Sequence, residues 1–493
     1  TSLALSVPRY RVYVDLITIK ESVFNDHIQS LSDSLSSLLP QNSSEEWQNL
    51  LVKQRENGNR YYFIARGLNN DQIERLKNFP IFSLGKYKGG CIITKTTKRV
   101  KPYGMLANRT IGYVVENEGS SPILVGLEGA FNSYLKGQNG QMLMEKIRGN
   151  EWKPVNDDYS IEPVPGSDLY TSIDVNIQDV THHALLGALE NFEADHGTAI
   201  VMETETGAIR AVANLGRTKE GKYYEKLNYA IGESHEPGST FKLMALVAAL
   251  EDQVIDTTTV FDTQNGELTF YGKYKVRDSR KGGYGKIPIT EIFERSSNTG
   301  MVQAIYNEYN SKPEQFVNRL MNMGLSEPLG LPIVGEAKPV IPHPDKKGWS
   351  GISLPWMAYG YGVLMTPMQT LTFYNAIAND GVMVRPRFIE GTHNTRNQVK
   401  KQSEVEIINP SICSKETIGK VKSMLKGVVE KPWGTAHNIY DPNFAISGKT
   451  GTCQLDYNTE EVQYVASFVG YFPSDQPKYS CIVVIHRPDN EKG

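Results

Sequence analysis

The sequence contains little cysteine or histidine, and neither occurs at a spacing typical of a metal or disulfide site. Its 493 residues include four cysteines and nine histidines. The cysteines, Cys91, Cys413, Cys453 and Cys481, lie far apart without a C-x-x-C pair, and no H-E-x-x-H motif is present. A disulfide framework is not expected in such a long, cysteine-poor chain. We therefore predict neither structural disulfides nor a zinc site.

Long hydrophobic runs and an excess of one charge are also missing. The best runs, residues 244–250 and 481–485, are far shorter than the roughly 18 residues that a membrane-spanning helix needs. The chain opens inside a strand-like pattern without an initiator methionine, so a missing anchor says little about the full gene product. Lys and Arg total 52 against 55 Asp and Glu, a net charge of −3. This near balance argues against a nucleic-acid-binding protein.

Length and patterning predict two domains. A chain of 493 residues is too long for one ordinary domain. The loop-rich segment 150–166 contains three prolines and is the predicted boundary. It separates an α+β domain at residues 1–166, which is typical of a scaffold or docking module, from a larger domain at residues 167–493. In the first domain we expect strands and surface helices over residues 10–16, 23–39, 60–65 and 71–77.

The larger domain has predicted strands at both of its ends and helices between them. Residues 197–202 and 207–212 are hydrophobic runs joined by four polar residues, which predicts a hairpin. Residues 464–471 and 480–485 add two strands from the end of the chain. This order predicts a mixed α/β fold with an antiparallel sheet and helices on its faces.

An S-x-x-K motif, Ser239 to Lys242, begins the most hydrophobic helix of the chain. Pro237 and Gly238 break the preceding segment, and residues 241–250 are almost entirely hydrophobic. Ser239 then lies in the first turn, where free N–H groups favour a developing negative charge. Lys242 lies on the same face one turn later. Because burial disfavours the ammonium form, such a lysine can accept a proton near neutral pH and activate the serine.

Two further polar motifs follow. Residues 296–298, Ser-Ser-Asn, place a hydroxyl and an amide two positions apart, although alone this is common turn or helix-cap chemistry. Residues 449–451 are the only Lys-Thr-Gly of the chain, and Gly448 and Gly451 permit close approach of another backbone or a ligand. The spacings among the three motifs, 57 residues from Ser239 to Ser296 and 151 from Asn298 to Lys449, leave room for one helical domain between them.

Other interpretations of these motifs are weaker. Residues 83–86, 133–136 and 423–426 also match S-x-x-K, but they lack the Pro-Gly entry and the hydrophobic helix. The Gly-Lys-Thr at residues 448–450 does not fit a phosphate-binding loop, because no glycine stands at the required upstream offset.

In this order the three motifs resemble the signature of penicillin-binding proteins. The resemblance to class B, the monofunctional D,D-transpeptidases, covers nearly the whole chain, although Lys101 replaces a family tyrosine in residues 99–104. Residues 236–239 and 359–362, Glu-Pro-Gly-Ser and Tyr-Gly-Tyr-Gly, favour the division-specific FtsI type. Further similar blocks are residues 126–129, 135–137, 366–369, 378–381 and 434–436. The resemblance implies a transpeptidase domain with an all-helical subdomain, preceded by an elongated α+β pedestal domain related to a dimerisation domain.

The resemblance also implies roles for the first two motifs. Ser239 attacks the carbonyl of the penultimate D-Ala of a stem pentapeptide, and Lys242 takes the proton. Ser296 relays that proton towards the leaving amine, and Asn298 orients Lys242 and the substrate amide. A β-lactam would trap Ser239 as a stable ester.

The third motif is then expected to bind the substrate. Lys449 and the hydroxyls of Thr450 and Thr452 meet the terminal carboxylate, with Gly451 between them. The backbone N–H groups of Ser239 and Thr452 form the oxyanion hole, where one donor is usually worth a few kcal/mol of barrier. No cofactor or metal is needed.

The family further implies partners and a location. We expect a SEDS-type glycan polymerase and divisome proteins as partners, and septal cell-wall synthesis at the outer face of the bacterial cytoplasmic membrane, in the periplasm. A single-pass N-terminal anchor would lie outside this sequence. Two rival functions stay open: a D,D-carboxypeptidase or β-lactamase-like hydrolase, against which the long N-terminal region argues, and a non-catalytic β-lactam-binding receptor.

Overall fold

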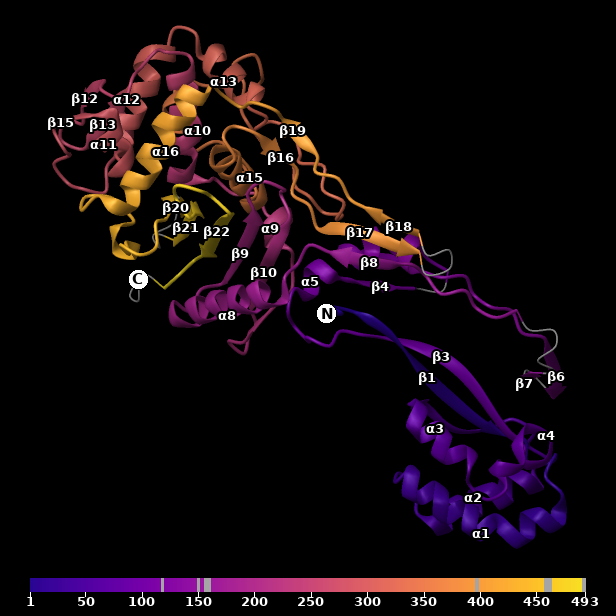
Figure 1. The fold of residues 1–493 in the computed structure, drawn as a ribbon. Coiled ribbons are helices and arrows are strands. Elements are labelled where there is room, and N and C mark those ends of the chain that lie inside the picture. The colour runs from indigo at the N-terminus through magenta and orange to yellow at the C-terminus, as the bar shows by residue number, and fades with distance from the viewer. Residues whose placement is uncertain (117–118, 149–150, 155–160, 395–398, 456–462, 490–493) are drawn as a thin grey trace. The chain divides into compact units, whose positions relative to one another are not determined.

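The computed structural model describes the chain except for residues 117–118, 149–150, 155–160, 395–398, 456–462 and 490–493 (Figure 1). The chain forms two compact units. The smaller unit contains Thr1–Gly104 and Gly137–Pro165, and the larger contains Met105–Lys136 and Gly166–Gly493. Among the described residues no helix combines the length and hydrophobicity that would cross a membrane. The predicted boundary after residue 166 remains a prediction, and Met105–Lys136 groups with the larger unit.

The smaller unit is built on a three-stranded antiparallel sheet in the order β2-β1-β3. Its predicted strands and helices are present. They are β1 (Leu5–Val14), α1 (Glu21–Leu38), α2 (Ser44–Glu56), β2 (Tyr62–Leu68), α3 (Asn70–Lys77), η1 (Phe82–Leu84), α4 (Gly85–Gly89), β3 (Cys91–Val100), β6 (Met144–Arg148) and β7 (Glu151–Pro154). Leu31 and Leu35 on α1 are fully buried with Trp47 of α2, so this surface helix contributes one face to a core.

A six-stranded antiparallel sheet forms the centre of the larger unit. Its order is β11 (Tyr223–Tyr224), β10 (Ile209–Arg217), β9 (His196–Glu203), β22 (Tyr479–His486), β21 (Gln463–Phe472) and β20 (Ser447–Leu455). The predicted hairpin is β9–β10, and the two predicted C-terminal strands are β21 and β22. Because β22 pairs with β9, strands from the beginning and the end of the domain are neighbours in the middle of the sheet. β20 forms one edge of the sheet.

Helices cover both faces of this sheet, as predicted for the fold class. Ala199 of β9 packs in a cluster with Leu185 and Leu189 of α8 (Val175–Asn191). The next residue, Ile200, belongs to the main core, which includes α10 (Lys242–Glu251), α15 (Pro367–Ala378) and α16 (Lys415–Glu430). Since successive strand residues point to opposite faces, α8 and this helical core lie on opposite sides of the sheet.

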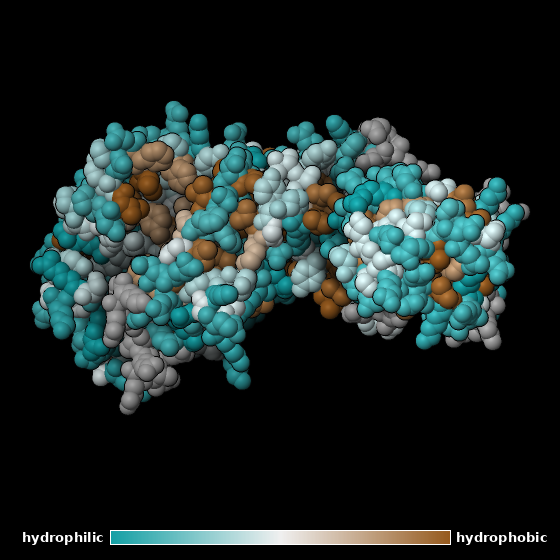
Figure 2. Space-filling model, turned by 90° about the horizontal axis from the view of Figure 1, so that it is seen from below, coloured by the Kyte–Doolittle hydropathy of each residue, from teal (hydrophilic) through white to brown (hydrophobic). Residues whose placement is uncertain are grey.

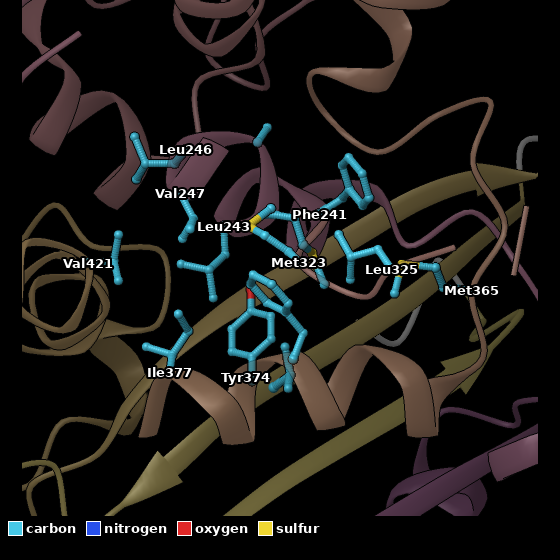
Figure 3. Close-up of a cluster of buried hydrophobic side chains, with 14 of the residues drawn as sticks. Phe241, Leu243, Leu246, Val247, Met323, Leu325, Met365, Tyr374, Ile377 and Val421 are labelled. Carbon is cyan, nitrogen blue, oxygen red and sulfur yellow. The ribbon is translucent and has the colours of Figure 1, made fainter. Parts of the chain in front are cut away.

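Helix α10 is buried on every side, as its sequence predicted. Every residue from Lys242 to Leu250 is buried. Figure 3 shows Leu243 and Val247 of α10 among side chains of the neighbouring helices, including Tyr374 of α15 and Val421 of α16. The face of the molecule in Figure 2 is mostly hydrophilic, with hydrophobic residues in small groups between, as expected when the hydrophobic runs are internal.

The part of the chain between the first motif and the third also carries short strand pairs, which lie before the second motif and which the sequence interpretation did not include. Its elements are β12 (Val260–Asp262), β13 (Glu267–Phe270), β14 (Tyr274–Arg277), β15 (Lys286–Pro288), α11 (Ile289–Glu294), α12 (Asn298–Tyr309), α13 (Pro313–Asn322) and α14 (Ser353–Met357). β12 pairs with β15 and β13 with β14. The remaining elements of the larger unit are α5 (Asn108–Ile111), β4 (Tyr113–Val115), β5 (Ile123–Val125), α6 (Gly126–Ala130), α7 (Asn132–Leu135), β8 (Asp168–Thr171), α9 (Tyr229–Gly232), η3 (Gly238–Phe241), β16 (Met383–Val384), β17 (Ile389–Asn394), β18 (Val399–Gln402), β19 (Ile407–Asn409) and η4 (His437–Ile439).

The segment Met105–Lys136 is tied to the larger unit by polar and hydrophobic contacts. The backbone N–H of Arg109 donates to Glu225 Oε2 at 2.5 Å. Leu127 is 2% exposed and belongs to the main core. This part of the N-terminal region therefore contributes directly to the stability of the larger unit.

We expect Leu127→Ala to lower the free energy of unfolding of the larger unit by about 2–5 kcal/mol, because it removes buried methyl groups and leaves a cavity. Leu124→Ala is the matched control, since Leu124 is 41% exposed in the same segment and should cost less than about 1 kcal/mol. Urea unfolding of both variants measures the difference. Equal losses would mean that Leu127 does not anchor this segment.

Candidate active site

Ser239 lies in the 3₁₀ turn η3, directly before α10. The turn begins at Gly238, whose φ of 53° is in the left-handed region that glycine adopts most easily. A Cβ atom at Gly238 would lie 2.9 Å from the carbonyl oxygen of Thr452 on β20. The Gly238 N–H donates to the carbonyl of Gly360 at 3.1 Å. The Pro-Gly entry thus lets the serine turn pack closely against edge strand β20.

Lys242 is fully buried, and its ammonium group connects the first motif to the second. Its Nζ donates to the carbonyl oxygen of Ser296 at 2.7 Å, to Ser296 Oγ at 3.1 Å and to Asn298 Oδ1 at 2.7 Å. In the described part of the chain no hydrogen bond joins Lys242 to the hydroxyl of Ser239. Ser296 has a φ of 57°, an uncommon left-handed conformation for a serine that brings both of its oxygens to the lysine.

The middle residue of the second motif has a structural role. Ser297 caps α12, because its side chain accepts a hydrogen bond from the Gly300 N–H, and its hydroxyl donates to both carboxylate oxygens of Asp278. Asn298 Nδ2 donates to the carbonyl of Arg277 at 2.7 Å, which turns its Oδ1 atom towards Lys242. The common helix-cap interpretation is therefore right for Ser297, while Ser296 and Asn298 contact the lysine.

Lys449 provides a second fully buried ammonium group, on β20. Its Nζ donates to the carbonyl oxygen of Thr450 at 3.0 Å and lies 5.8 Å from the centre of the Phe293 ring. Thr450 Oγ1 lies 2.6 Å from Thr435 Oγ1. Thr435 belongs to the Gly-Thr-Ala segment noted in the sequence, and the structure places it beside the third motif.

The glycine of Lys-Thr-Gly lets the serine turn approach the strand. A Cβ atom at Gly451 would lie 2.8 Å from Cγ2 of Thr240 in η3. Thr452 is exposed, and Thr450 on the same face is half-buried. Because β20 is an edge strand, one row of its backbone groups is not used by β21, which leaves it open to pairing with an extended peptide.

The two buried lysines have unusual electrostatics. Burial lowers the pKa of Lys242 to about 7, an effect that the charge of Asp278 partly opposes. Burial also lowers the pKa of Lys449, and the positive charge of Lys242 adds to that shift. No carboxylate of the described residues forms an ion pair with either ammonium group. The site therefore offers a proton acceptor near neutral pH and a place where an anion would be stabilised.

Sequence reasoning missed the residues that support these groups. Asp278 had no motif to mark it and reaches the site through the β14 region. Cys453, which received no role, is buried with its Sγ 3.8 Å from Glu236 Oε2. Glu236 also accepts from the Gly362 N–H at 2.8 Å, and Tyr361 OH accepts from the Gln454 N–H at 3.1 Å. The Glu-Pro-Gly-Ser and Tyr-Gly-Tyr-Gly blocks were the available signals, because they join η3 to the end of β20.

The other S-x-x-K segments lack this environment. Lys136 pairs with Glu116 at 2.5 Å with its side chain 50% exposed, and Lys426 pairs with Asp475 at 3.2 Å with its side chain 34% exposed. Lys86 lies over the exposed ring of Tyr87. The hydrogen bond to Asp475 raises the pKa of Lys426, so this lysine keeps its proton near neutral pH.

Comparison with known proteins identifies the family. Residues 197–493 match the family described as Penicillin binding protein transpeptidase domain. The chain belongs to this family. Residues 1–171 match the Penicillin-binding Protein dimerisation domain. With both domains and FtsI-named relatives, the chain is a class B penicillin-binding protein of the FtsI type, as its motifs predicted.

Its relatives are similar over nearly the whole chain. Peptidoglycan D,D-transpeptidase FtsI of Buchnera aphidicola subsp. Schizaphis graminum is 27% identical, and the match covers 99% of this chain and 81% of the relative. FtsI of Escherichia coli K12 is 25% identical, with coverage of 99% and 78%. The crystal structure of Penicillin Binding Protein 2X from Streptococcus thermophilus superimposes with a TM-score of 0.83 at 23% identity, over 99% of this chain and 75% of that one. This last likeness concerns the fold of a penicillin-binding protein.

Proposed function

We propose that this penicillin-binding protein is a peptidoglycan D,D-transpeptidase of septal cell-wall synthesis, with Ser239 as its nucleophile. The observation that carries the proposal is that the serine turn η3 packs against edge strand β20 and leads directly into the buried Lys242, whose pKa burial lowers to about 7. Lys242 is held by Ser296 and Asn298, so the first two motifs act as one unit. The FtsI relatives carry the name of this activity.

Acylation begins with Ser239 Oγ attacking the carbonyl carbon of the penultimate D-Ala. Neutral Lys242 accepts the hydroxyl proton as the C–O bond forms. The backbone N–H groups of Ser239 and Thr452 stabilise the oxyanion. Ser296, within hydrogen-bond distance of Lys242 Nζ, passes the proton to the amine of the terminal D-Ala, and that residue leaves as the C–N bond breaks.

Substrate binding uses the third motif. The donor peptide lies along β20, and its terminal carboxylate meets Lys449 together with the hydroxyls of Thr450 and Thr452. A carboxylate beside Lys449 favours its charged form and offsets the cost of burying that charge. Gly451 keeps the strand close to the serine turn, and Asn298 orients the substrate amide.

Deacylation completes the transfer. The amine of a neighbouring stem peptide attacks the carbonyl carbon of the Ser239 ester, and its proton passes through Ser296 and Lys242 to Ser239 Oγ. The ester C–O bond breaks as the new peptide bond forms, which joins the two strands and regenerates the serine. A β-lactam carries a strained amide and a carboxylate in a similar arrangement, so it acylates Ser239 and leaves no departing group to make room for the acceptor.

The rest of the chain fits a membrane-tethered role. We assign residues 167–493 to the transpeptidase domain and residues 1–166 to a pedestal that docks partners, with a segment of it packed on the catalytic unit. A single-pass anchor preceding this sequence would hold the protein at the periplasmic face of the cytoplasmic membrane. There a SEDS-type glycan polymerase and divisome proteins would supply and direct the substrate.

A thioester acyl donor ending in a D-alanine mimic distinguishes this function from its rivals. We expect repeated turnover, with transfer of the acyl group to an added D-amino acid that increases with acceptor concentration. Mass spectrometry of the products measures transfer and hydrolysis together. Hydrolysis without transfer would favour a carboxypeptidase, and a single acylation without release would favour a β-lactam-binding receptor.

A further inference from the structure

Three histidines and a glutamate gather at one end of the central sheet. His196 at the start of β9 is paired directly with His486 at the end of β22. Directly opposed residues of antiparallel strands project from the same face of the sheet, with Cβ atoms about 4.5–5.5 Å apart. Their rings are 4.2 Å apart and nearly parallel. The strand register therefore brings two imidazoles together from positions far apart in the chain.

A carboxylate completes this cluster from a third element. Glu233 follows α9, and its Oε2 atom lies 2.8 Å from His196 Nε2 and 3.4 Å from His486 Nε2. The three ligand atoms all lie within 4.8 Å of one another. Ligands that share a tetrahedral ion at about 2.0–2.2 Å lie about 3.3–3.6 Å apart, so only small side-chain rotations separate this arrangement from a coordination site.

We propose that His196, Glu233 and His486 form a binding site for a divalent transition-metal ion, best matched by Zn²⁺, which ties the segment before Ser239 to the central sheet. Two imidazoles and a carboxylate are a donor set that suits Zn²⁺ rather than Mg²⁺ or Ca²⁺, which take oxygen ligands. Binding requires the two parallel rings to tilt so that both Nε2 lone pairs meet at one ion. The fourth position is open to water or to a neighbouring side chain.

The surroundings of the cluster fit a ligand site. His235 lies beside it, its ring 5.2 Å from that of His486, and its Nδ1 atom is buried without a hydrogen-bond partner among the described residues. An orphaned buried nitrogen costs free energy that a nearby ion, or a water bound to that ion, can offset. The ring of Tyr229 stacks on His196 at 4.3 Å and restricts its rotation.

The ion would also have access from solvent. The side chain of Glu233 is 34% exposed, and the residue borders an open cavity of about 430 Å³. His196 and His486 lie further inside, with side chains 19% and 9% exposed. A half-exposed carboxylate with two inner imidazoles permits loading of the folded protein.

Metal binding here would restrain the segment of the chain that leads to Ser239. Glu233 and Ser239 are separated by one short segment, and within it Glu236 accepts from the Gly362 N–H. An ion held by β9, β22 and Glu233 would fix the first end of this segment, while the contacts of Glu236 and Gly238 fix its second end. The ion would act as a positioning element and would touch no reacting atom. The site itself does not depend on the identity of the enzyme reaction.

Metal titration of the whole chain tests the proposal. Protein stripped with a chelator is titrated with Zn²⁺ alone or Co²⁺ alone, and we expect one equivalent to bind, visible-band absorption typical of tetrahedral Co²⁺, and a higher melting temperature with Zn²⁺. His196→Ala and Glu233→Gln should each weaken binding by at least about tenfold and remove the temperature shift. His183→Ala is the matched control, because His183 lies exposed on α8 beside Asp179 and should change none of these readouts.

Glu233→Gln keeps the size of the side chain, so it separates loss of a ligand from loss of fold. Circular dichroism of the metal-free variants confirms folding before each titration. Absence of a stoichiometric Zn²⁺ or Co²⁺ complex in the wild type, or undiminished binding in a His196→Ala/His486→Ala double variant, would overturn the site. Metal binding and the melting temperature are measured without any reaction at Ser239, so a failed transpeptidase assay would leave this test intact.

Discussion

Ser239→Ala is expected to abolish covalent labelling by a fluorescent penicillin while leaving the folded protein nearly unchanged. With Ser239 as the proposed nucleophile, the substitution removes the oxygen that would form the acyl ester. Ser239 is half-buried in η3, and its hydroxyl makes no hydrogen bond to Lys242 in the described chain. We therefore expect a change of less than about 0.5 kcal/mol in the free energy of unfolding.

Ser423→Ala provides the matched control for this experiment. Ser423 begins another S-x-x-K segment, on α16, and Lys426 of that segment is half-buried and paired with Asp475. Gel fluorescence and intact-protein mass after incubation with the penicillin should show full labelling of this control. Labelling that persists in Ser239→Ala, or is lost in Ser423→Ala, would show that the nucleophile is assigned wrongly.

Most of the correct fold predictions came from patterns within short stretches of neighbouring residues. The hydrophobic run after Ser239 predicted a helix buried on all sides, and α10 is such a helix. Alternating runs predicted β9, β10, β21 and β22, because a strand buried on one or both faces repeats every two residues. Their arrangement into one antiparallel sheet followed from their order, with strands at both ends of the domain.

The candidate site could be predicted where the residue types of a motif determine the local backbone conformation. Pro237 and Gly238 indicate a turn, and the structure shows why glycine is needed there, since a side chain would meet the backbone of Thr452. The motif could not show how Lys242 is held. That depends on the left-handed conformation of Ser296, which places its carbonyl and its hydroxyl on the same ammonium group.

Features that depend on contacts between residues far apart in the chain could not be predicted from the sequence. Asp278 reaches the site only because α12 begins beside the β14 region, and no local pattern distinguishes it from the other aspartates of the chain. His196 and His486 are opposed only through the register of β9 and β22. The scattered histidines therefore predicted no metal site, although two of them are neighbours in space. The grouping of Met105–Lys136 with the larger unit has the same origin, in tertiary contacts such as that of Leu127.

Lys242→Arg should lose β-lactam acylation as severely as Lys242→Ala, by a factor on the order of 10² to 10⁴. A guanidinium keeps its proton throughout the working range, so it preserves the charge and the donors but cannot act as a base. Lys449→Arg should be milder, because binding a carboxylate needs positive charge and donors rather than proton transfer. Stopped-flow acylation rates of the three variants and the wild type give this comparison.

The pH dependence of acylation by the wild type also tests whether Lys242 acts as the base. Burial lowers the pKa of Lys242 to about 7, so its neutral, proton-accepting form increases as the pH rises through that value. Acylation should rise between about pH 6 and 8 and then level off, whereas an ordinary lysine would give a rise near its reference pKa of about 10.4. The variants lacking the base should show no such rise. If Lys242 only positioned Ser239 through a hydrogen bond, arginine would retain substantial activity and the profile would be flat across this range, and either result would exclude the base role.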